Sequence, residues 1–166
     1  MEDGLMRNDK CATASIATPR WFGYALQSLV YLAHHVENDV RCPSGEIANK
    51  VSTEATLMRR ILARLAKANI VEAREGRDGG YYLRKSPESI TLAEVYRALE
   101  MSEPLCTGMM DTANGVIGTD IKDAFGTIMR ETEQMMMEFL EKKTIADLVH
   151  KVYAECKERE QVVIES

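Results

Sequence analysis

The chemical groups that stand out in this chain of 166 residues are basic side chains gathered in one short stretch. They recur at helical spacing and are Arg59, Arg60, Arg64 and Lys67. The spacing predicts a helix over residues 54–68, with these side chains on or beside its polar side. The opposite, leucine face comprises Leu57, Ile61, Leu62 and Leu65. Guanidinium groups suit phosphates and the paired acceptors of guanine. The alternative interpretation is a solvated basic helix face with no partner.

The distribution of charge favours nucleic acid more than the total charge does. The whole chain has 21 basic and 26 acidic residues and a net charge of −5, which at face value argues against a polyphosphate partner. Residues 18–86 alone contain eleven basic and seven acidic residues, or +4, and the remainder is therefore −9. The basic excess thus lies in the stretch that carries the arginine-rich helix.

Two short helices are predicted around a three-residue break, which is a helix-turn-helix arrangement. Ser44, after Pro43, is the expected N-cap of the first helix, and the break covers residues 51–53. The second helix would enter the major groove of DNA. The candidate contacts on and before this helix are Thr53, Thr56, Arg59, Arg60 and Arg64.

A β-hairpin is predicted directly after this unit. Val71 and Ala73 alternate with charged residues, glycines punctuate residues 76–80, and an apolar run resumes at Tyr81. A hairpin that follows a helix-turn-helix is the wing of a winged-helix domain. Arg77, among the tip glycines, is a candidate for contact with a minor groove. Its alternative is a solvent-exposed turn residue.

A long helix over residues 119–142 carries a heptad rhythm. Its apolar side is spaced 4, 3, 4, 3, 4 and comprises Ile121, Phe125, Ile128, Thr132, Met135 and Phe139. Such a stripe outside a domain with its own core predicts pairing with a second copy of the chain. The predicted dimerisation residues are Ile121, Phe125, Ile128, Met135 and Phe139.

The expected architecture is mainly α with a small β-hairpin wing: a winged helix-turn-helix domain plus a long dimerisation helix. Residues 1–17 are expected to be a flexible N-terminal extension, 18–100 the DNA-binding domain, 101–118 a sensory or linker loop, and 119–166 the dimerisation helix and a C-terminal helix. No stretch approaches the roughly 18 apolar residues of a membrane span, and we expect a cytoplasmic protein. Catalytic motifs are absent, so an enzyme is not expected.

Three stretches resemble a family of bacterial winged-helix regulators that includes IscR, NsrR and CymR. They are YALQSLVYLA at 24–33, IANKVSTEATLMRRILARLAKANIV at 47–71 and GRDGGYYLRKSPESITLAEVYRALE at 76–100. The resemblance implies a homodimeric transcription factor, usually a repressor, that reports on iron–sulfur status, nitric oxide, thiols or a small metabolite. Family members begin with a basic segment where this chain has Trp21, Phe22 and Gly23, which leaves Arg20 as the nearest substitute for a phosphate contact.

The four cysteines lie 31, 64 and 50 residues apart, so no pair has a metal-ligand spacing. Cluster-binding members of the family have three cysteines close together in the loop before the long helix, and here that loop has only Cys106. We therefore expect no iron–sulfur cluster and no other metal. Cys106, Cys42 and Cys11 are candidates for thiol-based redox sensing, with idle thiols as the alternative.

The sequence therefore predicts a homodimeric repressor that binds double-stranded DNA at a near-palindromic operator. Thiol oxidation or a small effector would modulate its affinity. The competing prediction is a protein-interaction adaptor that uses the heptad helix and does not bind DNA. The salt dependence of duplex binding discriminates the two, because phosphate contacts weaken steeply as salt rises.

Overall fold

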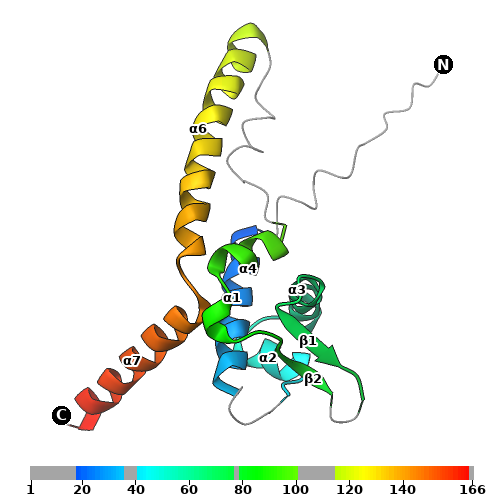
Figure 1. The fold of residues 1–166 in the computed structure, drawn as a ribbon, viewed down its shortest axis with the longest axis vertical. Coiled ribbons are helices and arrows are strands. Elements are labelled where there is room, and N and C mark those ends of the chain that lie inside the picture. The colour runs from blue at the N-terminus through cyan, green and yellow to red at the C-terminus, as the bar shows by residue number, and fades with distance from the viewer. Residues whose placement is uncertain (1–17, 36–40, 77–78, 101–114, 165–166) are drawn as a thin grey trace.

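The protein is mainly helical with one antiparallel hairpin, as predicted. The computed structural model describes residues 18–35, 41–76, 79–100 and 115–164 (Figure 1). Along the chain its elements are α1 (Thr18–His35), α2 (Ser44–Lys50), α3 (Ala55–Lys67), β1 (Val71–Arg74), β2 (Gly80–Leu83), the 3-10 turn η2 (Pro87–Ser89), α4 (Leu92–Ala98), α6 (Gly115–Glu141) and α7 (Ile145–Ile164). The elements from α1 to α4 form a body from which α6 and α7 project in different directions (Figure 1).

A single apolar core joins the elements of this body. Its largest fully buried side chains come from α1, α2, α3, the segment before β1 and the residues on either side of α4: Leu29, Leu32, Ile47, Met58, Ile61, Leu62, Leu65, Ile70, Ile90 and Leu99. Each such side chain contributes about 1.5–3 kcal/mol through removal from water. The predicted leucine face of α3 is confirmed for Ile61, Leu62 and Leu65, but Met58 is fully buried and Leu57 only half-buried.

The turn between α2 and α3 is closed by backbone hydrogen bonds. The amide of Thr53 donates to the carbonyl of Ala48 at 2.9 Å, and Ser52 takes the left-handed conformation with φ of 55°. This pattern ends a helix by satisfying its last carbonyls. The predicted N-cap of α2 is wrong by one residue. Pro43 is the N-cap and Ser44 begins the helix, because the Pro43 carbonyl already accepts from the amide of Ile47 at 3.1 Å.

The wing is a two-stranded hairpin braced on its inner side by Cys42. In the register, Val71 pairs with Leu83 and Arg74 with Gly80. Cys42 adds a one-residue bridge to Tyr81, exchanging backbone hydrogen bonds of 3.1 and 2.9 Å. A Cβ at Gly80 would lie 2.9 Å from the carbonyl carbon and oxygen of Cys42, so this close approach requires glycine.

The start of α7 returns to the core of the body. Ile145 is fully buried there, its amide donates to the Ile90 carbonyl at 3.0 Å, and the amide of Leu92 donates to the Lys143 carbonyl at 2.8 Å. Thr144 and Asp147 form a capping box, in which each backbone amide donates to the other side chain at 2.8 and 3.3 Å. The core that α1 to α4 share thus also includes Ile145, which lies beyond the predicted boundary at residues 118 and 119.

Two predicted segments fall outside the described residues: the N-terminal extension at 1–17 and most of the loop at 101–118. The long helix begins at Gly115, four residues before its predicted start. Among the described residues, no helix is long and apolar enough to cross a membrane.

Candidate nucleic-acid interface

The outer side of α3 is basic and exposed. Thr56, Arg59 and Arg60 are exposed there, whereas Met58, Ile61 and Leu65 hold the opposite side of the helix in the core. Burial of the apolar side thus fixes which side chains α3 presents outward, and the helix contains no acidic residue to oppose them. Figure 1 shows α3 and the hairpin on the same side of the body.

Two of the arginines lie against the indole of Trp21 on α1. The guanidinium carbon of Arg64 is 4.9 Å from the ring centroid, and that of Arg60 is 5.9 Å from it. Arg64 is half-buried and also donates a hydrogen bond to the Leu99 carbonyl at the end of α4. The predicted contacts Arg60 and Arg64 therefore have different surroundings, one exposed and one held inside the body.

A groove of about 530 Å³ lies beside the start of α3. It brings together two predicted site residues, Arg20 and Thr53, which are 33 positions apart in the chain. Its polar lining includes Tyr24, Asn49 and Ser52, and Glu54 adds one negatively charged side chain. Hydroxyl, amide and guanidinium donors at the beginning of a helix are the groups that hold DNA phosphates.

Two basic side chains at the wing, Arg41 and Arg84, were not among the predicted DNA contacts. The guanidinium carbon of Arg41 lies 5.9 Å from the centroid of the Tyr82 ring, and Arg84 donates to the Asn69 side chain at 2.9 Å. Arg41 reaches β2 because its neighbour Cys42 pairs with Tyr81, and no pattern along the chain marks that pairing. Arg77, the predicted minor-groove contact, lies outside the described residues.

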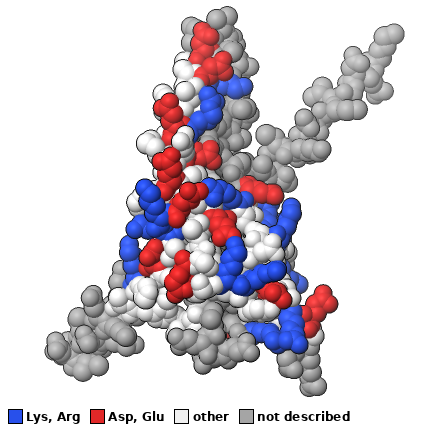
Figure 2. Space-filling model, in the orientation of Figure 1, with Lys and Arg blue, Asp and Glu red and all other residues white. Residues whose placement is uncertain are grey.

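The surface charge divides between the body and α6. Figure 2 shows Asp and Glu gathered along α6 and most of the Lys and Arg on this face over the body below it. Residues 115–141 contain six carboxylates and two basic side chains, whereas α3 has four basic residues and none acidic. The distribution agrees with the division into a basic segment and an acidic remainder that the sequence suggests.

The predicted heptad stripe of α6 is open on the single chain. Its largest side chains are between half and two-thirds exposed: Ile121 51%, Ile128 56%, Met135 63% and Phe139 61%, with Phe125 half-buried. A different side of the helix, carrying Glu133, Met137 and Leu140, faces the body. The stripe is therefore not used for packing within the described part of the chain.

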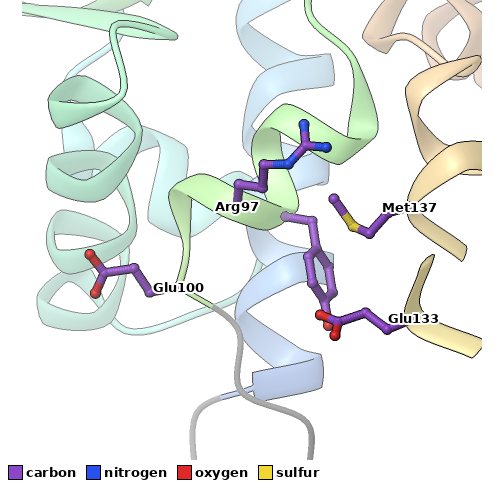
Figure 3. A pocket seen from close by; sticks show the side chains of 5 residues that line it. Arg97, Glu100, Glu133 and Met137 are labelled. Atoms are coloured by element: carbon purple, nitrogen blue, oxygen red, sulfur yellow. The ribbon is translucent and has the colours of Figure 1, made fainter. Parts of the chain in front are cut away.

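A second groove of about 330 Å³ lies where α6 meets α4 (Figure 3). One side is lined by Tyr96 and Arg97 of α4 and by Glu100, which follows α4. The other side is lined by Glu133 and Met137 of α6. Arg97 forms an ion pair with Glu141 across this junction. The groove combines charged side chains with the ring of Tyr96 and the thioether of Met137. Its lining contains no set of residues arranged for catalysis.

Cys42 is the only predicted sensing cysteine within the described residues, and it is fully buried. Burial raises the pKa of its thiol, and the nearby carboxylate of Glu46 raises it further, although the side chain of Tyr31 acts in the opposite sense. The Tyr31 hydroxyl donates to the same carboxylate at 2.6 Å, and this bond raises the pKa of Tyr31. A buried thiol with a raised pKa is a poor nucleophile. Cys106 and Cys11 lie outside the described residues.

The described residues do not fit an iron ion or an iron–sulfur cluster. No three histidine, cysteine, aspartate or glutamate side chains among them converge on one point. Cys42 stands apart as a buried side chain bracing the wing. The expectation that the chain holds no cluster stays a prediction, since Cys106 is not among these residues.

Comparison with known proteins points to one family. A family model described as "Rrf2: Iron-dependent Transcriptional regulator" matches residues 20–151. YwnA of Bacillus subtilis, described as an HTH-type transcriptional regulator, is 28% identical over 126 residues, which is 75% of this chain and 93% of YwnA. The regulator NsrR of Bacillus licheniformis is 34% identical over 77 residues, 46% of this chain and 53% of NsrR.

Solved structures share the fold at low sequence identity. IscR of T. potens has a TM-score of 0.60 at 18% identity, covering 84% of this chain and 90% of its own. A protein of Lactobacillus plantarum described as a transcriptional regulator has a TM-score of 0.67 at 19% identity, covering 88% and 98%. The family model spans most of the chain, including the helix-turn-helix, the wing and α6. The chain therefore belongs to the Rrf2 family of transcriptional regulators.

Proposed function

We propose that this regulator is a homodimeric repressor that reads duplex DNA with α3. DNA binding as such follows from membership of the family. The observation that carries the proposal is the exposed basic side of α3, which adjoins the groove of Arg20 and Thr53 and lies on the same side of the body as the wing. We call α3 the recognition helix from here on.

The recognition helix enters the major groove, where Thr56, Arg59 and Arg60 reach base edges or phosphates. Arg20 and Thr53 hold the backbone beside the start of the helix. Arg77 at the tip of the wing reaches the adjacent minor groove. Exposure supports the assignments of Arg20, Thr56, Arg59 and Arg60, because exposed side chains can meet the duplex without rearranging the core.

Two copies pair through the stripe of α6. The exposed side chains of Ile121, Ile128, Met135 and Phe139 would otherwise remain in water. A symmetric pair places two recognition helices about 34 Å apart, which predicts a near-palindromic operator. The main alternative is a protein-interaction adaptor that uses the same stripe and binds no DNA.

A small effector or oxidation of a thiol modulates the affinity. Burial and a raised pKa argue against Cys42 as the thiol, which leaves Cys106 and Cys11 as candidates. Oxidation to a sulfenic acid or a disulfide near the long helix would shift the two recognition helices relative to each other. We propose no bound cluster.

The test is fluorescence anisotropy of the reduced protein with duplex DNA from upstream of its own gene, repeated over a series of salt concentrations. We expect steep salt dependence, and Arg60→Ala should weaken binding by about 5- to 150-fold without dissolving the dimer. Lys151→Ala is the matched control, because Lys151 is exposed on α7. Absence of duplex binding, or an affinity indifferent to salt, would favour the adaptor. Repeating the titration with oxidised protein tests the thiol switch.

A further inference from the structure

The start of α1 places two aromatic side chains, Trp21 and Phe22, between the recognition helix and α4. Trp21 lies against Arg64 and Arg60 of α3 at 4.9 and 5.9 Å. Phe22, the next residue, packs edge-on against Tyr96 of α4 with ring centroids 5.6 Å apart. The start of α1 therefore contacts the recognition helix on one side and α4 on the other.

Arg64 is the residue at which these three helices meet. Its guanidinium has the indole of Trp21 on one side and donates to the carbonyl of Leu99, the C-cap of α4. The last carbonyls of a helix have no partner within the helix and carry partial negative charge, so a guanidinium is a favourable donor to them. Arg64 is half-buried, in contrast to the exposed Arg59 and Arg60.

A second contact joins the same two elements one turn further along α3. Lys67 Nζ lies 3.9 Å from Glu100 Oε1, with both side chains exposed, and this pair adds little by itself. Glu100 directly follows Leu99 and has a left-handed φ of 51°. The recognition helix thus meets the end of α4 at two successive residues, 99 and 100.

We propose that Arg64 is a positioning residue that sets the orientation of the recognition helix, with Trp21 as its platform, and that it makes no contact with DNA. The inference rests on the proposed function and changes the assignment that helical spacing alone gives to Arg64. Its side chain is half-buried, and its guanidinium is held between the Trp21 indole and the Leu99 carbonyl. Arg60, which is exposed and lies 5.9 Å from the centroid of the same ring, remains available to the duplex.

The contacts of residue 64 require a planar guanidinium group. Arginine can stack on an indole and donate in its own plane at once, whereas lysine is a compact, strongly hydrated point charge. Arg64→Lys therefore keeps the charge and loses the geometry. A phosphate contact would tolerate this change, but a positioning contact would not.

The experiment compares Arg64→Lys and Arg64→Gln with the wild-type dimer in two measurements. The first is the emission of Trp21 without DNA, which is a clean probe because the chain has one tryptophan. We expect both substitutions to change that emission. Arg59→Gln is the matched control, because Arg59 is exposed on the same helix and its Nε donates to its own helix at the Ala55 carbonyl; its emission should equal that of the wild type.

The second measurement is duplex affinity as a function of salt. If Arg64 is a positioning residue, both Arg64 variants should lose about fivefold or more in affinity. The slope of log affinity against log salt should then stay unchanged. If Arg64 instead contacts a phosphate, Arg64→Gln should lower the slope by about 0.9, and Arg64→Lys should bind the duplex as the wild type does. Trp21→Ala should reproduce the Arg64→Gln result.

A reduced salt slope in Arg64→Gln, rescue of affinity by Arg64→Lys, or unchanged Trp21 emission in both variants would each overturn the inference. Failure of the proposed function has a different signature. In that case the wild type does not bind the duplex, while the emission measurement still decides whether Arg64 holds the Trp21 junction.

Discussion

Truncation of one side chain in the α6 stripe gives the sharpest test of the dimer. Ile128 is 56% exposed on the single chain, so about half of the 1.5–3 kcal/mol gained on fully burying such a side chain remains available to a partner. Ile128→Ala removes most of that gain in each copy. Because a two-fold dimer contains the substitution twice, we expect a loss of about 1–2.5 kcal/mol, or a dimer about 5- to 60-fold weaker.

Sedimentation equilibrium over a concentration series measures this dissociation constant directly. Gln134→Ala is the matched control, because Gln134 is exposed on the same helix but lies outside the stripe. Its side-chain Nε2 donates a hydrogen bond to Glu138 Oε1 at 3.0 Å. We expect its dimer to match the wild type. Equal dissociation constants for Ile128→Ala, Gln134→Ala and the wild type would refute pairing through the stripe.

Two further predictions concern how the body is held together. Gly80→Ala places a Cβ 2.9 Å from the backbone of Cys42 and should lower the free energy of unfolding by about 1–3 kcal/mol in urea titrations. Gly45→Ala, in open space on α2, should not lower it. The amide of Thr144 lowers the pKa of Asp147, so the stability from Asp147 is present at neutral pH and lost as pH falls through that lowered pKa. Asp147→Asn should therefore lower Tm at pH 7 and converge with the wild type in acid; a difference constant with pH would contradict this account.

The elements themselves could be predicted because their signals are local. Apolar residues at three-and-four spacing mark α3 and α6, and glycines 76–80 mark the tip of the wing. Errors at this level were small. Pro43 took the cap position expected for Ser44, and Met58 was buried more deeply than Leu57.

Contacts between elements were outside the reach of the sequence. Periodicity places Arg59, Arg60 and Arg64 beside one another on a helix, and all three therefore looked like DNA contacts. Only the packing of α1 and α4 separates Arg64 from the other two. Its partners Trp21 and Leu99 lie 43 and 35 positions away in the chain, and no local pattern links such positions.

The same reasoning applies to the groove and to the wing. Arg20 and Thr53 were predicted separately, and the groove that joins them depends on how α1 crosses the turn before α3. Arg41 was missed because its place on Tyr82 follows from the bridge between Cys42 and Tyr81. A single backbone pairing thus carries a basic group to the wing.

The return of the chain to the core at residues 143–145 makes α6 a lever with one fixed end. Backbone hydrogen bonds to Ile90 and Leu92 hold that end, next to the ion pair of Arg97 and Glu141. The 27 residues of α6 span about 40 Å at 1.5 Å per residue. A tilt of about 5° at the fixed end therefore moves the far end by about 3.5 Å, close to the rise of about 3.4 Å between successive base pairs. If two copies pair through α6 as proposed, angular changes this small between α6 and the body would be enough to move the two bodies out of register with their half-sites.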